Sequence, residues 1–484
     1  MADLACTTFS VPTSSVPTEY WDKNMKIRNI SSWMGTILLA VLAVSQVQAQ
    51  SIDIKPTDST SQIFKVRTQL EGRGVVIPED ETALKLKVDA TFEYDERVIA
   101  RTSQLKSIRT YSNATAKLNI DNKPMVNQLA RGKRVVINQA KGIDQPIQIA
   151  SLGGPITQNE FELINTPANS LILANIFEKK SVKKGDTWKP KDEVLANFLN
   201  IDSIDTSDVQ IELSSHDRKR ASLVISGKVE GTIDGANTTL DINGSIRFNL
   251  AAGVVEQAEI TINQDRDIGL LAPGLDATFK IVTQIQPAGS NSSLSDEGLA
   301  ELRKNASKIT DSLLLSPNGT SLSMLHPRSW KVIADQSSRT ILRYSKNGRM
   351  IGQCDIIPLP NRLAKQSQSL EQFKSVIKTS LAESAGQITG GTQSTTRYGL
   401  DWLRVDAKGT VSGVDLQWTY YTISNPDGRR VQLVFTTEPT HVKSFAGRET
   451  SLVESIRFHE VEKTPGQNAG YKKPATISGV GNSK

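Results

Sequence analysis

The chain has 484 residues, of which 38% are hydrophobic and 22% are charged. This composition is typical of a globular protein long enough for more than one core. The formal net charge is only +6, from 57 basic and 51 acidic residues, and the basic residues do not gather in one stretch. Because aromatic residues are also scarce, at 5%, we expect no nucleic-acid partner.

Residues 25–49 have the three parts of a signal peptide. Lys26 and Arg28 supply the positive start, Trp33 to Val44 form a mainly apolar run, and Ala49 ends the small-residue segment that signal peptidase reads. The apolar run is shorter than the roughly 20 residues that span a bilayer, so we expect no integral membrane span after cleavage. No cysteine follows the run to carry a lipid anchor. The sequence therefore predicts a periplasmic or secreted protein, and whether the signal is cleaved stays open.

Residues 1–24 fit no part of this signal, since they contain no arginine and carry three acidic residues. That composition argues against an organellar transit peptide. We interpret residues 1–24 as a mis-assigned extension and Met25 as the initiator. After cleavage the chain has one cysteine, Cys354, which lies in a strand-like run and is expected to be a buried, inert thiol.

In residues 50–288 apolar and polar side chains mainly alternate with a period of two, which predicts strands with one buried face. Leu84 to Tyr94 alternate apolar and polar side chains, and similar runs recur between turn-forming pairs such as Asp234–Gly235, Asn243–Gly244 and Ala252–Gly253. Short strands joined by tight turns predict an antiparallel β-meander, because parallel strands need long crossovers.

A few short helices interrupt this β-rich domain. Thr157 and Glu160 have the spacing of a capping box, and 191–199 is a second helical stretch. Between them, Val182-x-x-Gly185-Asp186-Thr187-Trp188 resembles a turn found in uncharacterised β-rich bacterial exported proteins. We expect Trp188 to pack on the sheet, with stacking on a ligand as the alternative.

Residues 289–319 form a predicted linker with one amphipathic helix. Ser295 is a suitable N-cap, and the helix has apolar residues at spacings of three and four that should dock it on a neighbouring element: Leu299, Leu302, Ala306, Ile309 and Leu313. Residues 461–484 lack apolar periodicity, and we interpret them as a disordered tail.

Residues 320–460 combine strand-like runs with two predicted helices, from Ser369 to about Ala385 and from Thr440 to Ser455. In the first, Phe373, Val376, Ile377 and Leu381 should point inward. The segment resembles the PsbP-like/DcrB-like family of exported domains in its Pro327-x-x-Trp330 and in its end at 456–458. The resemblance implies an α/β/α sandwich with an antiparallel sheet, an accessory, assembly or binding role, and no shared catalytic residues. The expected fold class of the whole chain is α+β.

No residue pattern predicts a catalytic, cofactor or metal site. The four histidines are scattered, and Asp202, Asp205 and Asp208 lack the glycine and terminal acidic residue of a calcium loop. There is no nucleophile elbow and no phosphate-binding loop. We therefore expect a protein that is not an enzyme and uses no cofactor.

Three functions remain open from the sequence. The first is a non-enzymatic binding or assembly factor for an unknown protein partner, with Trp188, Trp418 and Tyr420 as a possible binding surface and core packing as their alternative role. The second is a carrier of a lipid or other apolar ligand in the β-rich domain. The third is a hydrolase with an unrecognised site.

The signal predicts the amino terminus of the exported chain. N-terminal sequencing of that chain should begin at Gln50, directly after the small-residue segment. A mature protein that retained residues 1–24 would contradict both the cleavage site and the choice of Met25 as the initiator.

Overall fold

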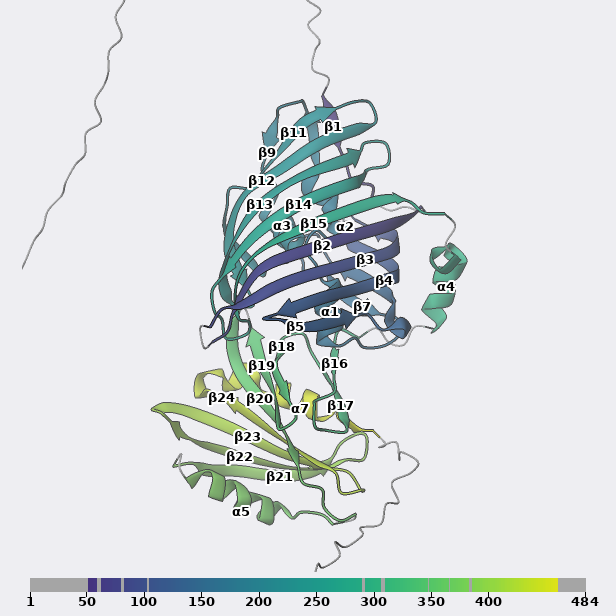
Figure 1. Cartoon of the computed structure of the whole chain (residues 1–484). Helices are drawn as coiled ribbons and strands as arrows, with labels where there is room; N and C mark the ends of the chain where they lie inside the picture. Colours follow the sequence, from purple (N-terminus) through teal and green to yellow (C-terminus); the bar gives the residue numbers. More distant parts are fainter. Residues whose placement is uncertain are drawn as a thin grey trace, which may run out of the picture. The chain divides into compact units, whose positions relative to one another are not determined.

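The computed structural model describes residues 51–459, apart from short gaps at 59–61, 80–81, 102–103, 290–291, 306–309, 347, 365 and 383–384. The predicted extension, the whole of the predicted signal peptide and the predicted tail therefore lie outside the described residues. The described residues belong to one compact unit, which is dominated by a thirteen-stranded and a seven-stranded sheet (Figure 1). Among them, no helix combines the length and the apolar character needed to cross a membrane.

The thirteen-stranded sheet is made of two runs of antiparallel strands. The first run contains β2 (Ile63–Ile77), β3 (Leu84–Ala100), β4 (Leu105–Ile120), β5 (Lys123–Gln128), β6 (Val135–Ala140) and β7 (Gln148–Ser151). The second contains β9 (Thr187–Trp188), β10 (Ser203–Ser207), β11 (Gln210–His216), β12 (Arg220–Ile233), β13 (Ala236–Asn249), β14 (Val254–Arg266) and β15 (Gly274–Pro287). The runs join where β15 pairs with β2, from Gly274 opposite Ile77 to Pro287 opposite Phe64.

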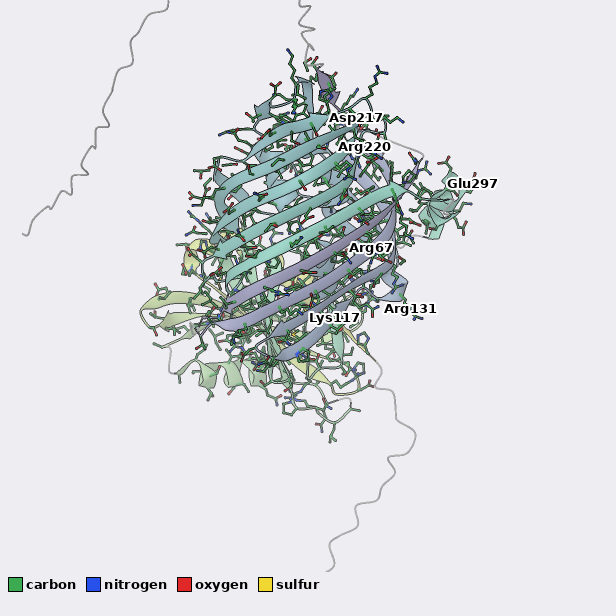
Figure 2. All side chains as sticks on the ribbon, turned by 45° about the horizontal axis from the view of Figure 1, so that its top comes forward. Arg67, Lys117, Arg131, Asp217, Arg220 and Glu297 are labelled. Atoms are coloured by element: carbon green, nitrogen blue, oxygen red, sulfur yellow. The ribbon has the colours of Figure 1, made fainter. Side chains whose placement is uncertain are left out.

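The alternation of side chains along each strand gives this sheet a buried face and a solvent-exposed face. On β2, Phe64 and Val66 are buried, whereas Lys65 and Arg67 are exposed. Exposed charged side chains such as Arg67 and Lys117 follow the strands of the sheet (Figure 2). The period-two pattern of the sequence is the cause of this division, because successive side chains of a strand point to opposite faces.

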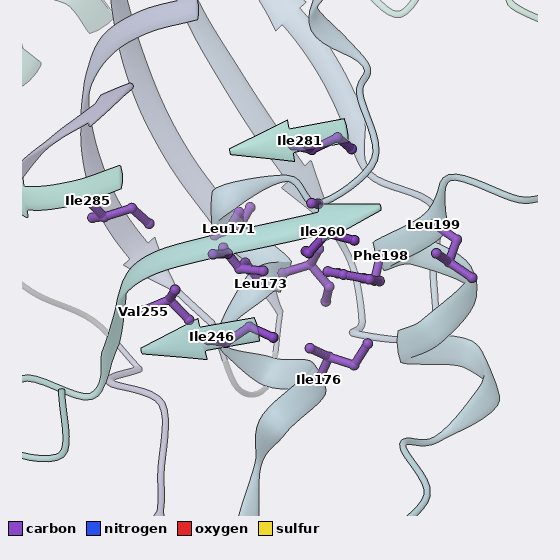
Figure 3. Packing of buried hydrophobic residues seen from close by; sticks show 14 of the residues in the cluster. Leu171, Leu173, Ile176, Phe198, Leu199, Ile246, Val255, Ile260, Ile281 and Ile285 are labelled. Atoms are coloured by element: carbon purple, nitrogen blue, oxygen red, sulfur yellow. The ribbon is translucent and has the colours of Figure 1, made fainter. Parts of the chain in front are cut away.

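Three short helices and one 3-10 turn cover the buried face: α1 (Gln158–Ile164), α2 (Ser170–Leu173), η2 (Asn175–Phe177) and α3 (Asp192–Leu199). The predicted capping box is confirmed, since Thr157 Oγ1 accepts from the Glu160 backbone and Glu160 Oε2 accepts from the Thr157 backbone. The side chains of Leu171, Leu173 and Phe198 have no exposed surface and pack against β13, β14 and β15 in one core (Figure 3).

A fully buried ion pair lies under α2. Arg109 Nε is 2.8 Å from Glu96 Oε1, and each side chain is only 3% exposed. The other Glu96 oxygen accepts from Ser170 Oγ at 2.6 Å, and Ser107 Oγ donates to Oε1 at 2.8 Å. Arg109 also donates to Asn169 Oδ1, the side chain that caps α2.

The surroundings of this pair decide its protonation. Burial by itself would raise the pKa of Glu96, but the charge of Arg109 and three side-chain hydrogen bonds outweigh it and hold that pKa below its usual value. Glu96 therefore stays ionised and binds Arg109, which in turn holds the cap of α2. The pair thus connects β3 and β4 to the helix that fills the buried face.

The seven-stranded sheet follows in the chain. Its order in space is β18 (Trp330–Gln336), β19 (Arg339–Lys346), β20 (Arg349–Leu359), β24 (Arg430–Thr437), β23 (Val414–Ser424), β22 (Asp401–Val411) and β21 (Gln387–Thr395), all antiparallel. On one face packs α5 (Leu370–Ser380), and on the other pack α6 (Val442–Phe445) and α7 (Arg448–Val453). Cys354 on β20 is free and fully buried, as expected, and burial raises the pKa of its thiol.

The predicted α+β class and the PsbP-like α/β/α sandwich are wrong. Strands dominate the described chain, and its helices are few and short. The predicted helix 440–455 is broken into η5 (Pro439–His441), α6 and α7, because Gly447 adopts a φ of +80° between the latter two. Short helices cannot form the two continuous layers that such a sandwich needs.

Other local predictions were partly wrong. Asn243–Gly244 is no turn but lies inside β13, where a Cβ at Gly244 would sit 3.1 Å from side chains of both neighbouring strands. Ser369 does cap α5 through a capping box, but Val376 is 57% exposed instead of inward. Pairing and packing with distant strands override the local signal in both cases.

The linker helix α4 (Asp296–Asn305) docks on the thirteen-stranded sheet, as expected. Leu299 is buried against Ile108 and Ile137, and Asp296 lies 2.6 Å from Arg97. Ala306 and Ile309 of the predicted apolar face lie outside the described residues, and Leu313 belongs to β16 (Leu313–Leu315) rather than to the helix. β16 pairs with β17 (Leu322–His326), which also pairs with β25 (Arg457–Phe458), and a separate ribbon joins β1 (Ile52–Ile54) to β8 (Lys179–Val182).

Removing one partner of the buried ion pair should destabilise the protein strongly. We expect Glu96→Ala to lower the free energy of unfolding by roughly 3–5 kcal/mol, because it leaves the Arg109 guanidinium buried without its counter-charge. Urea denaturation followed by circular dichroism measures the loss. The double variant Glu96→Leu/Arg109→Met should lose less than Glu96→Ala alone, and a larger loss in the double variant would contradict this account.

Candidate functional site

A cavity of about 520 Å³ lies between α1, α3, the β12–β13 turn and the start of β18. We call it the α1–α3 pocket, and its volume is in the range of small-ligand sites. Its walls mix amide, charged and apolar side chains, among them Gln158, Phe161, Glu162, Asn165, Asn200, Asp202, Asp234, Arg328 and Lys331.

The α1 wall is fixed by a glutamine. Gln158 and Glu162 are four residues apart and share one helix face, so Gln158 Nε2 donates to Glu162 Oε1 at 2.8 Å. Gln158 Oε1 accepts from the Val332 backbone at 2.8 Å. One side chain thus orients a pocket carboxylate and also binds the backbone of β18.

Two asparagines hold the ends of α1 and α3 together. Asn165 is the C-cap of α1, and Asn200, the C-cap of α3, has a left-handed φ of 57° that asparagine tolerates better than most residues. Asn165 Nδ2 donates to Asn200 Oδ1 at 3.1 Å, and Asn200 Nδ2 donates to the Asn165 carbonyl at 3.2 Å. These reciprocal hydrogen bonds fix one edge of the pocket.

The predicted turn at Asp234–Gly235 supplies a third wall. Both residues have positive φ, 55° and 75°, as a two-residue hairpin turn requires. Asp202 Oδ2 accepts from the Asp234 backbone at 2.6 Å, and the Asp234 carboxylate pairs with Lys331. Lys331 belongs to β18, so this ion pair joins the β12–β13 turn to β18 at the pocket wall.

The pocket is electrostatically acidic. Desolvation raises the pKa of Asp202, and the nearby Asp234 charge raises it further. Desolvation likewise raises the pKa of Glu162, although the side chain stays exposed and Lys331 acts in the opposite direction. The one other cation in the wall, Arg328, lies 4.4 Å from the Phe161 ring centre and 3.1 Å from Asp311.

The pocket offers binding chemistry without a recognisable catalytic set. Its walls contain no histidine or cysteine, and in the described ranges no three His, Cys, Asp or Glu side chains could together hold a metal ion. Asp202 and Asp208 of the acidic repeat instead accept from the backbones of Asp234 and Lys228. This arrangement can bind hydrogen-bond donors but lacks a base paired with a nucleophile.

The three residues predicted as a binding surface lie elsewhere. Trp188 is 8% exposed on β9, opposite Ile211, within the core of the thirteen-stranded sheet. Trp418 is also 8% exposed and, with the half-buried Tyr420, packs on the α5 face of the seven-stranded sheet. The structure therefore brings Trp418 and Tyr420 together and does not bring Trp188 to them.

The pocket residues carried only local signals in the sequence. Asn200 ends a predicted helix and Asp234 lies in a predicted turn, and both roles were fully explained by local backbone geometry. Their convergence depends on contacts between distant segments, such as that of Gln158 with Val332, 174 residues apart. A single sequence contains no signal for such contacts between distant segments.

Comparisons with known proteins do not place the chain in a family. No family model matches it, and no curated protein matches it. A Bacteroides thetaiotaomicron structure is 12% identical over 31% of this chain and 50% of its own, with a TM-score of 0.22. A Pseudomonas aeruginosa protein of unknown function, described as a putative regulator, is 15% identical over 31% of this chain and all of its own, with a TM-score of 0.21.

A lipovitellin structure is 9% identical over 49% of this chain and 26% of its own, with a TM-score of 0.28. The chain thus spans half the length of the first of these structures and about a quarter of lipovitellin. None of these structures shows a PsbP-like or DcrB-like relationship.

Loss of the Gln158 side chain should loosen the pocket and destabilise the protein. We expect Gln158→Leu to lower the free energy of unfolding by about 1 kcal/mol, because the Val332 N–H loses its acceptor. The matched control is Gln284→Leu on the exposed face of β15, which should change stability much less. Equal effects of the two variants in chemical denaturation would show that the Gln158 hydrogen bond contributes nothing.

Proposed function

We propose that the protein is an exported, non-enzymatic binding protein that holds a small polar ligand in the α1–α3 pocket. One observation carries this proposal: the polar side chains of the pocket are fixed by hydrogen bonds to each other and to the backbone before any ligand enters. Binding to such a preorganised wall costs little side-chain entropy.

The charges of the pocket define the ligand. Three carboxylates line it, Glu162, Asp202 and Asp234, but Lys331 is paired with Asp234 and Arg328 with Asp311. Among the described residues, Glu162 and Asp202 therefore lack a paired cation, whereas both cations of the wall are already paired. The complementary ligand is rich in hydrogen-bond donors, which describes an amine or a polyhydroxyl compound.

The export part of the proposal depends on residues 25–49. Their positive start, short apolar run and small residues before Gln50 favour delivery outside the cytosol. The single cysteine of the exported chain agrees with this, because a buried lone thiol needs neither a reducing compartment nor a disulfide partner.

The alternative of an apolar carrier is less favoured by the geometry. The buried face of the thirteen-stranded sheet is filled by α2 and α3, and the cavity between Phe64, Ser170 and Val255 is only about 10 Å³, room for about one water. A lipid could enter there only if α2 moved, which would break the contacts of Ser170 with Glu96 and Arg109.

Ligand screening tests the proposal. Thermal shift and calorimetry with panels of saccharides, polyols, polyamines and amino compounds should find a ligand that raises the melting temperature. Glu162→Gln and Asp202→Asn should each weaken its binding by about tenfold, because each removes a charged acceptor. Glu71→Gln, on the exposed face of β2, is the matched control and should bind normally.

Three outcomes would contradict the proposal. Undiminished binding by both pocket variants would place the ligand elsewhere. A chemically altered ligand after incubation, detected by mass spectrometry, would show an enzyme, and co-purified lipid in native mass spectra would favour the carrier.

A further inference from the structure

A second cavity lies within the seven-stranded sheet region. Its volume is about 420 Å³, and it is enclosed by β22, β23 and β24 on one side and α6 and α7 on the other. We call it the Glu449 pocket. It shares no lining residue with the α1–α3 pocket.

The Glu449 carboxylate is the unexplained group in this pocket. The residue is 6% exposed, and its Oε2 atom is buried without a hydrogen-bond partner within the described structure. Its Oε1 atom is 3.7 Å from Arg404 Nη1, too far for a hydrogen bond. A buried carboxylate oxygen with no donor is costly and rare in folded proteins.

Arg404 does not satisfy Glu449, because its guanidinium is committed to another acid. Arg404 Nε lies 3.0 and 3.2 Å from the two Asp406 oxygens, and Nη2 lies 3.0 Å from Asp406 Oδ1. Thr419 Oγ1 also donates to that Asp406 oxygen, at 2.9 Å. The Arg404–Asp406 pair is thus complete in itself and leaves Glu449 as the unmatched acceptor.

The rest of the wall is mixed, and its apolar part comes mainly from β24 and α6. Phe435 and Phe445 have ring centres 6.1 Å apart and line the cavity with Val442 and Ala446. The exposed Lys408 also lines the pocket but forms no ion pair with Glu449 in the described structure. A ligand that fits this wall has an apolar body and one donor head.

From these contacts we propose that the Glu449 pocket binds a small primary amine with an aromatic or aliphatic body. The ammonium group donates to Glu449 Oε2, and the apolar body lies against Phe435 and Phe445. An ammonium is favoured over a neutral donor because Glu449 Oε2 has no donor within the described structure, and Arg404, which lies 3.7 Å from Oε1, is also paired with Asp406. The aromatic rings can contribute further through their electron-rich faces.

Calorimetry with three probes of similar shape tests this assignment. 2-Phenylethylamine should bind the full chain, whereas 2-phenylethanol and 3-phenylpropanoate should bind at least about tenfold more weakly, because they lack the positive head. Equal binding of the amine and the alcohol, or no binding of the amine at millimolar concentration, would overturn the proposal. The latter result would mean that water alone serves Glu449.

Substitutions in the two pockets test where the amine binds. Glu449→Gln should weaken amine binding at least about tenfold, and Glu438→Gln, an exposed acid just before α6, is its matched control. If Glu449→Gln fails to fold, Ala446→Trp provides the second test, since it fills the pocket from an exposed position and should abolish binding. The two pockets share no lining residue, so Asp202→Asn should leave amine binding at Glu449 unchanged; a loss in Asp202→Asn together with undiminished binding by Glu449→Gln would assign the probe to the α1–α3 pocket and overturn the proposal.

Discussion

The ion pair of Arg109 with Glu96 is the interaction on which the larger sheet region depends. Without it, the capping Asn169 and the neighbouring Ser170 would lose their charged partners in a mainly apolar interior. Because Glu96 is on β3 and Arg109 on β4, the pair also fixes the two strands against the helix. A charge buried to this extent is tolerated only where every lone pair is used, and here both oxygens of Glu96 accept hydrogen bonds.

The local structure of the chain was largely readable from its sequence, for a physical reason. Alternation along 84–94, the capping boxes at Thr157 and Ser369, and the turn at Asp234–Gly235 each depend on a few neighbouring residues. The pairing of β2 with β15 depends on segments about 200 residues apart and had no local signal. The same limit explains the errors at Gly244 and Val376, where distant strands and helix packing decide the outcome.

The candidate site illustrates the same limit more sharply. Each polar residue of the α1–α3 pocket has a local role, as a cap, a turn residue or a helix-face neighbour, which is why none stood out as a binding residue. The tryptophans that did stand out, Trp188 and Trp418, turn out to be buried in separate cores. Aromatic content marked where the chain packs, whereas binding chemistry is found where caps and turns from separate segments meet.

The thirteen-stranded sheet is open, so its two margins expose unpaired backbone groups. One margin is formed by β7, with four residues, and β5, with six, and the other by β9, with two, and β10, with five. Long, flat margins can recruit a strand from another molecule and start polymerisation. Because these terminal strands are so short, a second copy could form only a few backbone hydrogen bonds with either margin. The wide sheet is thereby protected from edge-to-edge aggregation.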